Sequence, residues 1–235
     1  MLETMLKFLE GHPEFSSTLI GAIVGAIVSG VISLLLQSWI FRKENQRRIA
    51  DRLAIEQALC HSLYIKMSRI YSDIWNLNDH LKTSLERLGV QDNPIFKFLA
   101  VQPLATHPAA VSFSTEELLL MRQKKEVELF NDLLDIEAVH NNLIGLFEQY
   151  RNMREGVISV LPHEIDKANR TAVVAASDLV PIMPKVLAIY FLVEDMVKHC
   201  VKEERFSKTL LEQLNTALGK HYSIQQKIKF KGEAV

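Results

Sequence analysis

A long uncharged run near the N-terminus constrains this chain more than any other feature of its sequence. The run extends from Thr18 to Phe41 and contains no Asp, Glu, Lys or Arg. A helix over these residues is about 36 Å long, enough to cross the hydrocarbon core of a bilayer with some tilt. A buried helix of a soluble domain seldom runs so far without a charge. The sequence therefore predicts a short tail at 1–17, a transmembrane helix at 18–41 and a large domain at 42–235.

A cleaved signal peptide is the main alternative for an apolar segment in this position. Such a peptide begins with a basic region and ends in small residues at its cleavage site. Here Glu3, Glu10 and Glu14 precede the run with a single Lys7, and the run ends in aromatic residues followed by cations. We therefore expect the segment to remain attached as a membrane anchor.

Five cations follow the apolar run and predict its orientation: Arg42, Lys43, Arg47, Arg48 and Arg52. Cytoplasmic flanks of transmembrane helices carry this excess of Lys and Arg. We therefore expect the N-terminus outside and the large domain in the cytoplasm, with a bacterial inner membrane as the location. These side chains set the topology, and near an anionic lipid surface each adds about 1 kcal/mol of attraction. Membrane lipid is thus an expected partner.

Small side chains recur every four residues within the predicted span, at Gly21, Gly25, Ser29 and Ser33. This spacing lets two helix backbones approach closely and predicts self-association, although Gly is frequent in membrane helices generally. A second interpretation is that several copies surround a water-filled path. In that case Ser29, Ser33 and Gln37 would line it.

Beyond the membrane, apolar residues continue at alternating steps of three and four. This heptad spacing is typical of a coiled coil. It predicts an oligomer seam that includes Leu53, Leu63, Met67, Ile70, Ile74 and Leu77. Because neither Pro nor Gly occurs between Val31 and Leu88, the span and the first cytoplasmic helix are expected to form one rod that stops at Gly89.

The remaining sequence predicts an all-α fold, an elongated cytoplasmic helical bundle. Only 9 Gly and 7 Pro occur among 235 residues, which favours long helices. Ser114 and Glu117 form a capping-box pattern with Phe113 as a hydrophobic staple, so a helix should begin there and run to about Arg154. Two further helices are expected over 163–180 and 184–203, and a last one from about 207. Residues 89–113 form a connector that packs as a short helix or serves as a functional loop.

Composition excludes some classes of partner. With 27 basic and 28 acidic side chains, the chain lacks the excess of positive charge typical of nucleic-acid binding, so no nucleic acid is expected. Two cysteines, Cys60 and Cys200, are too few for a disulfide framework and are expected to be buried, reduced thiols.

No catalytic signature is visible, and we expect neither a cofactor nor a metal. Glu137 and His140 match one half of a carboxylate-bridged di-iron motif, but the second half is missing, which favours a polar pair between helices or in solvent. Asp195 and His199 are interpreted in the same way. His163–Glu164 lacks the second histidine of a zinc-protease helix.

In its layout the chain resembles small single-pass membrane effectors that accompany prokaryotic antiviral systems: a short outside tail, one span and a helical cytoplasmic sensor. The resemblance covers the architecture of the whole chain. It implies an oligomeric effector that perturbs membranes or forms pores and is regulated through its helical domain. An alternative function is a structural adaptor that displays a protein-binding surface at the membrane, and a membrane-tethered enzyme is a third.

Overall fold

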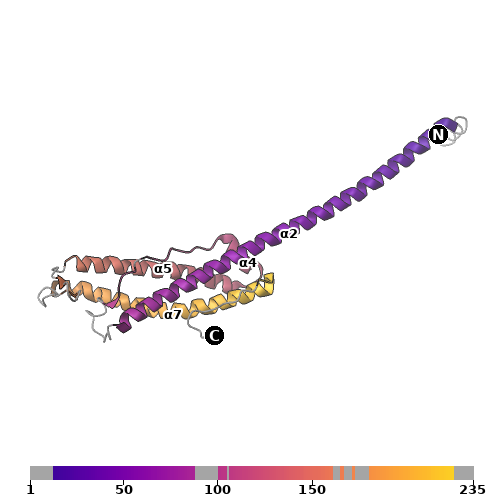
Figure 1. Cartoon of the computed structure of the whole chain (residues 1–235). Helices are drawn as coiled ribbons and strands as arrows, with labels where there is room; N and C mark the ends of the chain where they lie inside the picture. Colours follow the sequence, from indigo (N-terminus) through magenta and orange to yellow (C-terminus); the bar gives the residue numbers. More distant parts are fainter. Residues whose placement is uncertain are drawn as a thin grey trace. The chain divides into compact units, whose positions relative to one another are not determined.

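The computed structural model describes residues 13–87, 100–104, 106–160, 165–166, 171–172 and 180–224. Its helices are α2 (Pro13–Arg87), α4 (Thr115–Gln123), α5 (Val127–Ile158) and α7 (Met183–Tyr222), with the 3-10 turn η1 (Val180–Ile182) before α7 (Figure 1). The structure also contains one pair of two-residue strands, β1 and β2, between α5 and η1. The chain divides into two compact units, Met1–Ile55 and Glu56–Val235. The fold is helical, as the sequence predicts.

Helix α2 contains both the predicted span and the first predicted helix of the large domain. Pro13 stands at its first position, where the missing N–H costs no helical hydrogen bond, and no other proline occurs before Pro94. The prediction that both segments belong to one helix is confirmed. The helix ends at Arg87, and Gly89 lies outside the described residues.

The second unit is built around one apolar core. Seven side chains of α2 enter it at steps of three and four, each at most 1% exposed: Cys60, Leu63, Met67, Ile70, Ile74, Leu77 and Leu81. Helices α4, α5 and α7 supply most of the other side of this core. The periodic stripe on α2 therefore packs against the protein's own helices.

Helix α4 begins as predicted, but the long helix expected after it is divided. The Ser114 hydroxyl accepts from the Glu117 amide at 3.2 Å, and the Glu117 carboxylate accepts from the Ser114 amide at 2.6 Å. The helix then ends at Gln123, because Lys125 adopts φ 65° and turns the chain before α5 begins. The prediction of one helix to Arg154 was wrong at this turn. Within α4, Leu118 and Leu120 are buried, and Leu119 between them is 36% exposed.

Helices α5 and α7 pack along one another. Two helices had been expected in the stretch that α7 covers, with a new start near Ser207. Instead the Ser207 hydroxyl donates to the Glu204 carbonyl at 3.0 Å, and the helix continues to Tyr222. A serine that bonds back to the preceding turn is compatible with a helix interior, so its capping signal was misleading here.

The helix predicted over 163–180 is contradicted where the structure describes it. Ile165–Asp166 (β1) and Thr171–Ala172 (β2) pair antiparallel, Ile165 opposite Ala172. Asp166 and Asn169 favour turns because their side chains bond to nearby backbone groups. That preference competes with the helical pattern.

The connector before α4 is held to the core by polar contacts. In its described part, residues 106–114 form neither helix nor strand. Asn141 of α5 bonds both backbone groups of Val111, accepting from its N–H at 3.1 Å and donating to its C=O at 3.0 Å. The Tyr150 hydroxyl donates to the carbonyl of Val101. The expected short helix falls mostly on residues 88–99, outside the described part.

Candidate functional site

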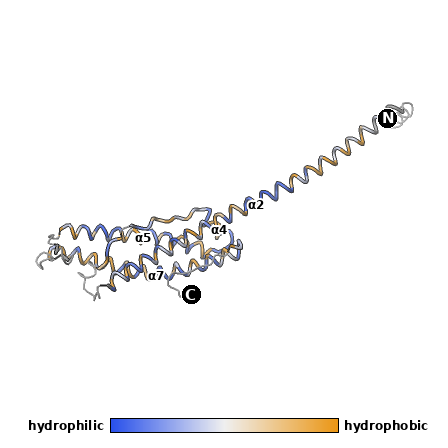
Figure 2. The backbone as a smooth tube through the Cα atoms, viewed as in Figure 1, coloured by the Kyte–Doolittle hydropathy of each residue, from blue (hydrophilic) through white to orange (hydrophobic). Residues whose placement is uncertain are grey.

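The apolar segment of α2 is bare within the chain. Its large apolar side chains, from Ile23 to Phe41, are 51 to 67% exposed. This segment is the one stretch of the described residues that is long and apolar enough to cross a membrane, and none of its most apolar window is buried. Figure 2 shows the N-terminal part of α2 as largely hydrophobic and followed by a hydrophilic stretch. By length and composition the helix suits a bilayer.

The small-residue stripe has open space around it. Apart from its chain neighbours and the nearby backbone of its own helix, a Cβ added at Gly21, Gly25 or Gly30 would meet nothing within 4 Å. Ser29, Ser33 and Gln37 are exposed as well. Self-association through this stripe, and a polar lining of a path, both stay predictions.

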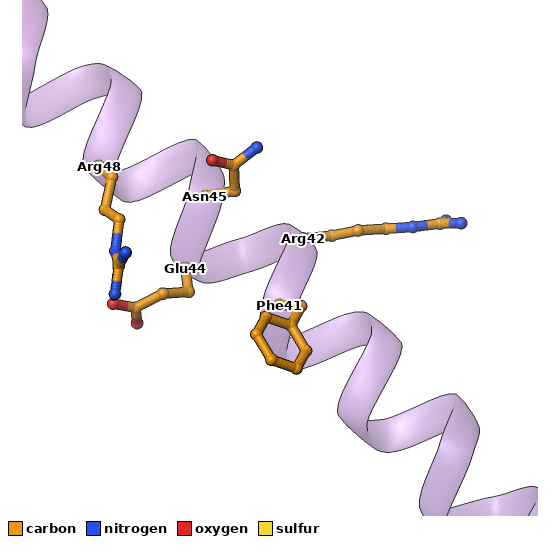
Figure 3. A pocket seen from close by; sticks show the side chains of 5 residues that line it. All are labelled: Phe41, Arg42, Glu44, Asn45 and Arg48. Carbon is orange, nitrogen blue, oxygen red and sulfur yellow. The ribbon is translucent and has the colours of Figure 1, made fainter.

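The cations after the apolar segment differ in their partners. Arg48 forms an ion pair with Glu44 at 3.2 Å, and the Lys43 ammonium lies 5.0 Å from the ring centre of Trp39. Arg52 is likewise engaged. Among the described residues no hydrogen bond or ion pair engages Arg42. A hollow of about 360 Å³ lies beside these groups and is lined by Phe41, Arg42, Glu44, Asn45 and Arg48 (Figure 3).

Most of the residues predicted to form an oligomer seam are occupied within the single chain. Five of them are at most 1% exposed in the core: Leu63, Met67, Ile70, Ile74 and Leu77. They are not available to a second copy while the domain keeps this packing, which corrects the interpretation of the pattern. Leu53 precedes the second unit and is 51% exposed, so its place in a seam stays a prediction.

Glu137 and His140 of α5 hold two other parts of the domain to this helix, through separate contacts. His140 is fully buried, and its Nε2 lies 3.2 Å from Asp73 Oδ2 of α2. The Glu137 carboxylate accepts from the Phe113 amide at 2.8 Å and from the Ser112 hydroxyl at 3.1 Å. His140 thus makes its interhelical contact with Asp73 instead of Glu137, and Glu137 fastens the connector to α5.

A second clamp escaped the sequence analysis. Glu117, whose side chain is 3% exposed, accepts from Lys66 Nζ of α2 at 2.7 Å. Burial alone would raise the pKa of Glu117, but hydrogen bonds from Lys66, Ser62 and the Ser114 backbone outweigh it and hold the pKa below its usual value. The capping pattern identified Glu117; its ion pair with a residue far along the chain had no local signal.

A third polar contact joins the start of α5 to the end of α7. The Glu126 carboxylate lies 2.8 Å from His221 Nε2 and 2.9 Å from Lys220 Nζ. These two partners, His221 first, lower the pKa of Glu126. The contact ties down the turn that follows α4.

An acidic groove of about 470 Å³ lies next to this contact and was also missed. It is lined by residues from the start of α5 and the last third of α7, which are far apart in the sequence. Burial, and then the charges of Asp135 and Glu128, raise the pKa of its Asp132. The groove carries Glu126, Glu128, Asp132, Glu212 and Lys220 among its charged residues.

The two thiols are buried and unpaired with one another. Burial raises the pKa of Cys60 to about 11 and that of Cys200 to about 12. Because the thiolate is the reactive form, this burial disfavours nucleophilic chemistry at both side chains. The prediction of buried, reduced cysteines is confirmed.

Metal-binding chemistry is not assembled in the described part of the chain, which contains no group of three His, Cys, Asp or Glu side chains able to hold an ion. Asp195 and His199 are both exposed on α7. His163–Glu164 lies outside the described residues. Comparisons with family models, with curated proteins and with solved structures find no match.

Proposed function

We propose that the protein is a single-pass membrane protein that tethers a helical adaptor domain to the cytoplasmic face of a membrane. One observation carries this proposal. The large apolar residues of α2 from Ile23 to Phe41 are uncovered, whereas the stripe of seven apolar residues from Cys60 to Leu81 on the same helix is buried in the core. Removing apolar surface from water is favourable by about 25 cal/mol per Å². A segment with this much exposed apolar area is therefore more stable when lipid surrounds it.

The cations from Arg42 to Arg52 support the orientation. They stand directly after the apolar segment, and the N-terminal tail carries more acidic than basic side chains. A Lys and Arg bias of this kind supports a cytoplasmic location for their side of the segment. A bacterial inner membrane fits this arrangement.

An adaptor is our first choice of activity because the structure accounts for the heptad stripe without an oligomer. The stripe closes a core fastened by the Lys66–Glu117 and Asp73–His140 pairs. Such a domain displays a defined surface, the property an adaptor for a protein partner requires.

Insertion is tested by placing two arginines in the middle of the apolar segment, Val28→Arg with Ile32→Arg. Each costs about 2.5–3.5 kcal/mol of insertion free energy, so the double variant should be lost from the carbonate-resistant membrane fraction. Ile55→Arg is the control, because Ile55 is 61% exposed but lies beyond the segment. Equal retention of both variants would overturn the anchor.

Topology is tested with a membrane-impermeant thiol reagent on intact cells. The native thiols are buried, so an engineered cysteine dominates the signal. Glu3→Cys should be labelled, and Gln213→Cys, on an exposed position of α7, should react only after lysis. The reverse pattern would show that the helical domain faces outside.

The second candidate function is an oligomeric effector that perturbs the membrane, the activity the antiviral layout implies. The observation that favours it is the exposed polar set Ser29, Ser33 and Gln37 within an apolar helix. Polar groups are unfavourable against lipid and suit a wet path between several copies.

Dye release from liposomes containing the purified protein separates the two candidates. The effector predicts leakage that Ser29→Ala, Ser33→Ala and Gln37→Leu together abolish while insertion persists. Gly25→Ile should reduce leakage too, because it prevents close approach of helices. If liposomes with the wild-type protein release no dye, the effector is rejected and the adaptor is the remaining candidate.

A further inference from the structure

The hollow at the C-terminal end of the apolar segment has the properties of a small anion site. It is lined by five residues of α2, within little more than two helical turns, and has a volume of about 360 Å³. All of them belong to the first unit. Because the apolar run ends at Phe41, the hollow stands where phospholipid headgroups begin if the segment spans a membrane.

The charges around the hollow add up to one unpaired cation. Its lining contains two arginines, Arg42 and Arg48, and one carboxylate, Glu44. Arg48 and Glu44 neutralise one another at 3.2 Å, and in Figure 3 their side chains point toward each other. Arg42 extends away from this pair. The hollow therefore suits a ligand with a single negative charge.

The donor groups suit a phosphate. A guanidinium binds two phosphate oxygens through parallel N–H bonds. Asn45 follows Arg42 by three residues, which places both on neighbouring positions of the helix surface, and its amide supplies a further donor. Arg42 and Asn45 extend from the same side of the helix in Figure 3.

Aromatic side chains complete the site toward the bilayer. Phe41 lines the hollow and is 67% exposed. Trp39, with Lys43 over its ring, lies half a turn before Phe41. Aromatic rings of this kind are enriched at the level of the headgroups, where Phe41 can contact the first methylenes of an acyl chain.

We propose that this hollow binds the phosphodiester of an anionic phospholipid with one net negative charge. Arg42 and Asn45 donate to the phosphate oxygens, and Phe41 packs against the acyl chain. A zwitterionic lipid binds less well because its ammonium finds the Glu44 carboxylate already paired with Arg48 and is repelled by Arg42. This inference rests on the proposed membrane anchor and names the lipid it selects.

The test is native mass spectrometry of the full-length protein in detergent with added phosphatidylglycerol or phosphatidylcholine. Arg42→Gln should reduce retained phosphatidylglycerol about tenfold, since a bidentate charged contact exceeds the roughly 1 kcal/mol of a diffuse cation. Asn45→Ala should reduce it about threefold, the loss of one hydrogen bond. The matched control is Arg47→Gln, which removes the same charge from α2 outside the hollow and should change retention less than twofold.

Three results would overturn the site. Equal loss in Arg42→Gln and Arg47→Gln would mean diffuse attraction without a binding site. Equal retention of the two lipids by the wild type would mean no selection of charge. Displacement of the lipid by excess inorganic phosphate, which itself binds in an Arg42-dependent way, would make free phosphate the ligand.

Carbonate extraction of the same membranes separates this inference from the proposed anchor. Arg42→Gln keeps four of the five cations and should remain in the membrane fraction. If the wild type is extracted by carbonate, the anchor itself is wrong. If the wild type stays but shows no preference for phosphatidylglycerol, only the lipid site is wrong.

Discussion

Two stretches of α2, residues 21–41 and 60–81, are both rich in apolar side chains but differ in how those side chains are distributed. In the first, apolar residues occur all around the helix and every side chain is exposed within the chain. In the second, seven of them form one stripe that is at most 1% exposed, and most residues on the other faces are polar, with Ile65 as an exposed exception. A helix that is apolar all round suits lipid, whereas a striped helix suits a protein neighbour.

The comparison also shows the limit of a heptad pattern. Spacing of three and four identifies which face of a helix is covered. It does not identify whether the cover is another copy or a later part of the same chain. Here α4, α5 and α7 supply it, so the stripe from Cys60 to Leu81 has its partner within the protein.

The largest effect that tests this comparison is expected for Met67→Asp. Met67 is fully buried, and an unpaired carboxylate there should lower the free energy of unfolding by about 4 kcal/mol. Ile65→Asp is the control two residues away, 65% exposed, and should change stability by less than about 0.5 kcal/mol. Denaturant unfolding followed by circular dichroism of the full chain in detergent measures both.

A different result for Met67→Asp would restore the coiled-coil interpretation. If the substitution left the unfolding curve unchanged but reduced the mass of the detergent-solubilised protein, the stripe would face a second copy.

A medium effect is expected for Glu117→Gln, which retains the capping group but removes the charge that Lys66 contacts. The pKa of Glu117 is lowered in the folded chain. Its contribution is therefore present above the usual pKa of about 4.3 and is lost as the pH falls through the lowered value. At pH 7 the variant should be less stable by about 1–3 kcal/mol, and the difference should vanish in acid.

The control for Glu117→Gln is Glu155→Gln. Glu155 pairs with Arg151 at 3.0 Å, but both side chains are about half exposed, and such pairs contribute at most about 1 kcal/mol. Unfolding curves at several pH values compare the two variants. A difference for Glu117→Gln that persists at low pH would show that charge is not the cause.

The smallest effect is a gain in stability for Lys125→Gly. Lys125 has φ 65°, a conformation that costs a side-chain-bearing residue about 1 kcal/mol and glycine almost nothing. Lys124→Gly should bring no gain, because Lys124 has φ −88° and its ammonium lies over the Tyr222 ring. Should both variants lose stability alike, the turn between α4 and α5 is not strained by Lys125.

Local sequence patterns predicted several features correctly. The Ser114–Glu117 cap lies within four residues, and both of its bonds form. The absence of proline predicted the continuity of α2. The same reasoning failed at Ser207, where a capping residue lies inside α7, and at 124–126, where no glycine announces the turn. At Ser207 the hydroxyl bonds back to the Glu204 carbonyl, and at Lys125 a residue other than glycine adopts a positive φ, each against a local preference worth about 1 kcal/mol.

Some features of the candidate site were also predictable from the sequence, and others required the structure. The cations after Phe41 and the small residues of the apolar segment are visible in the sequence because their meaning depends on near neighbours. The pairing of Arg48 with Glu44, which leaves Arg42 as the unpaired cation of the hollow, required side-chain positions. So did the Lys66–Glu117 and His140–Asp73 contacts, whose members lie on different helices.

By itself the sequence determined that the chain is helical, where its lipid-suited segment lies and how α4 begins. These features depend on interactions among residues within one or two helical turns, which neighbouring letters of the sequence contain. Only the tertiary structure decided that the heptad stripe closes the protein's own core, that α4 and α5 are separate helices, and which charges are paired. Burial, and pairs such as Lys66–Glu117 and Asp73–His140, depend on segments far apart in the chain, and the free energy of bringing those together appears in no local pattern.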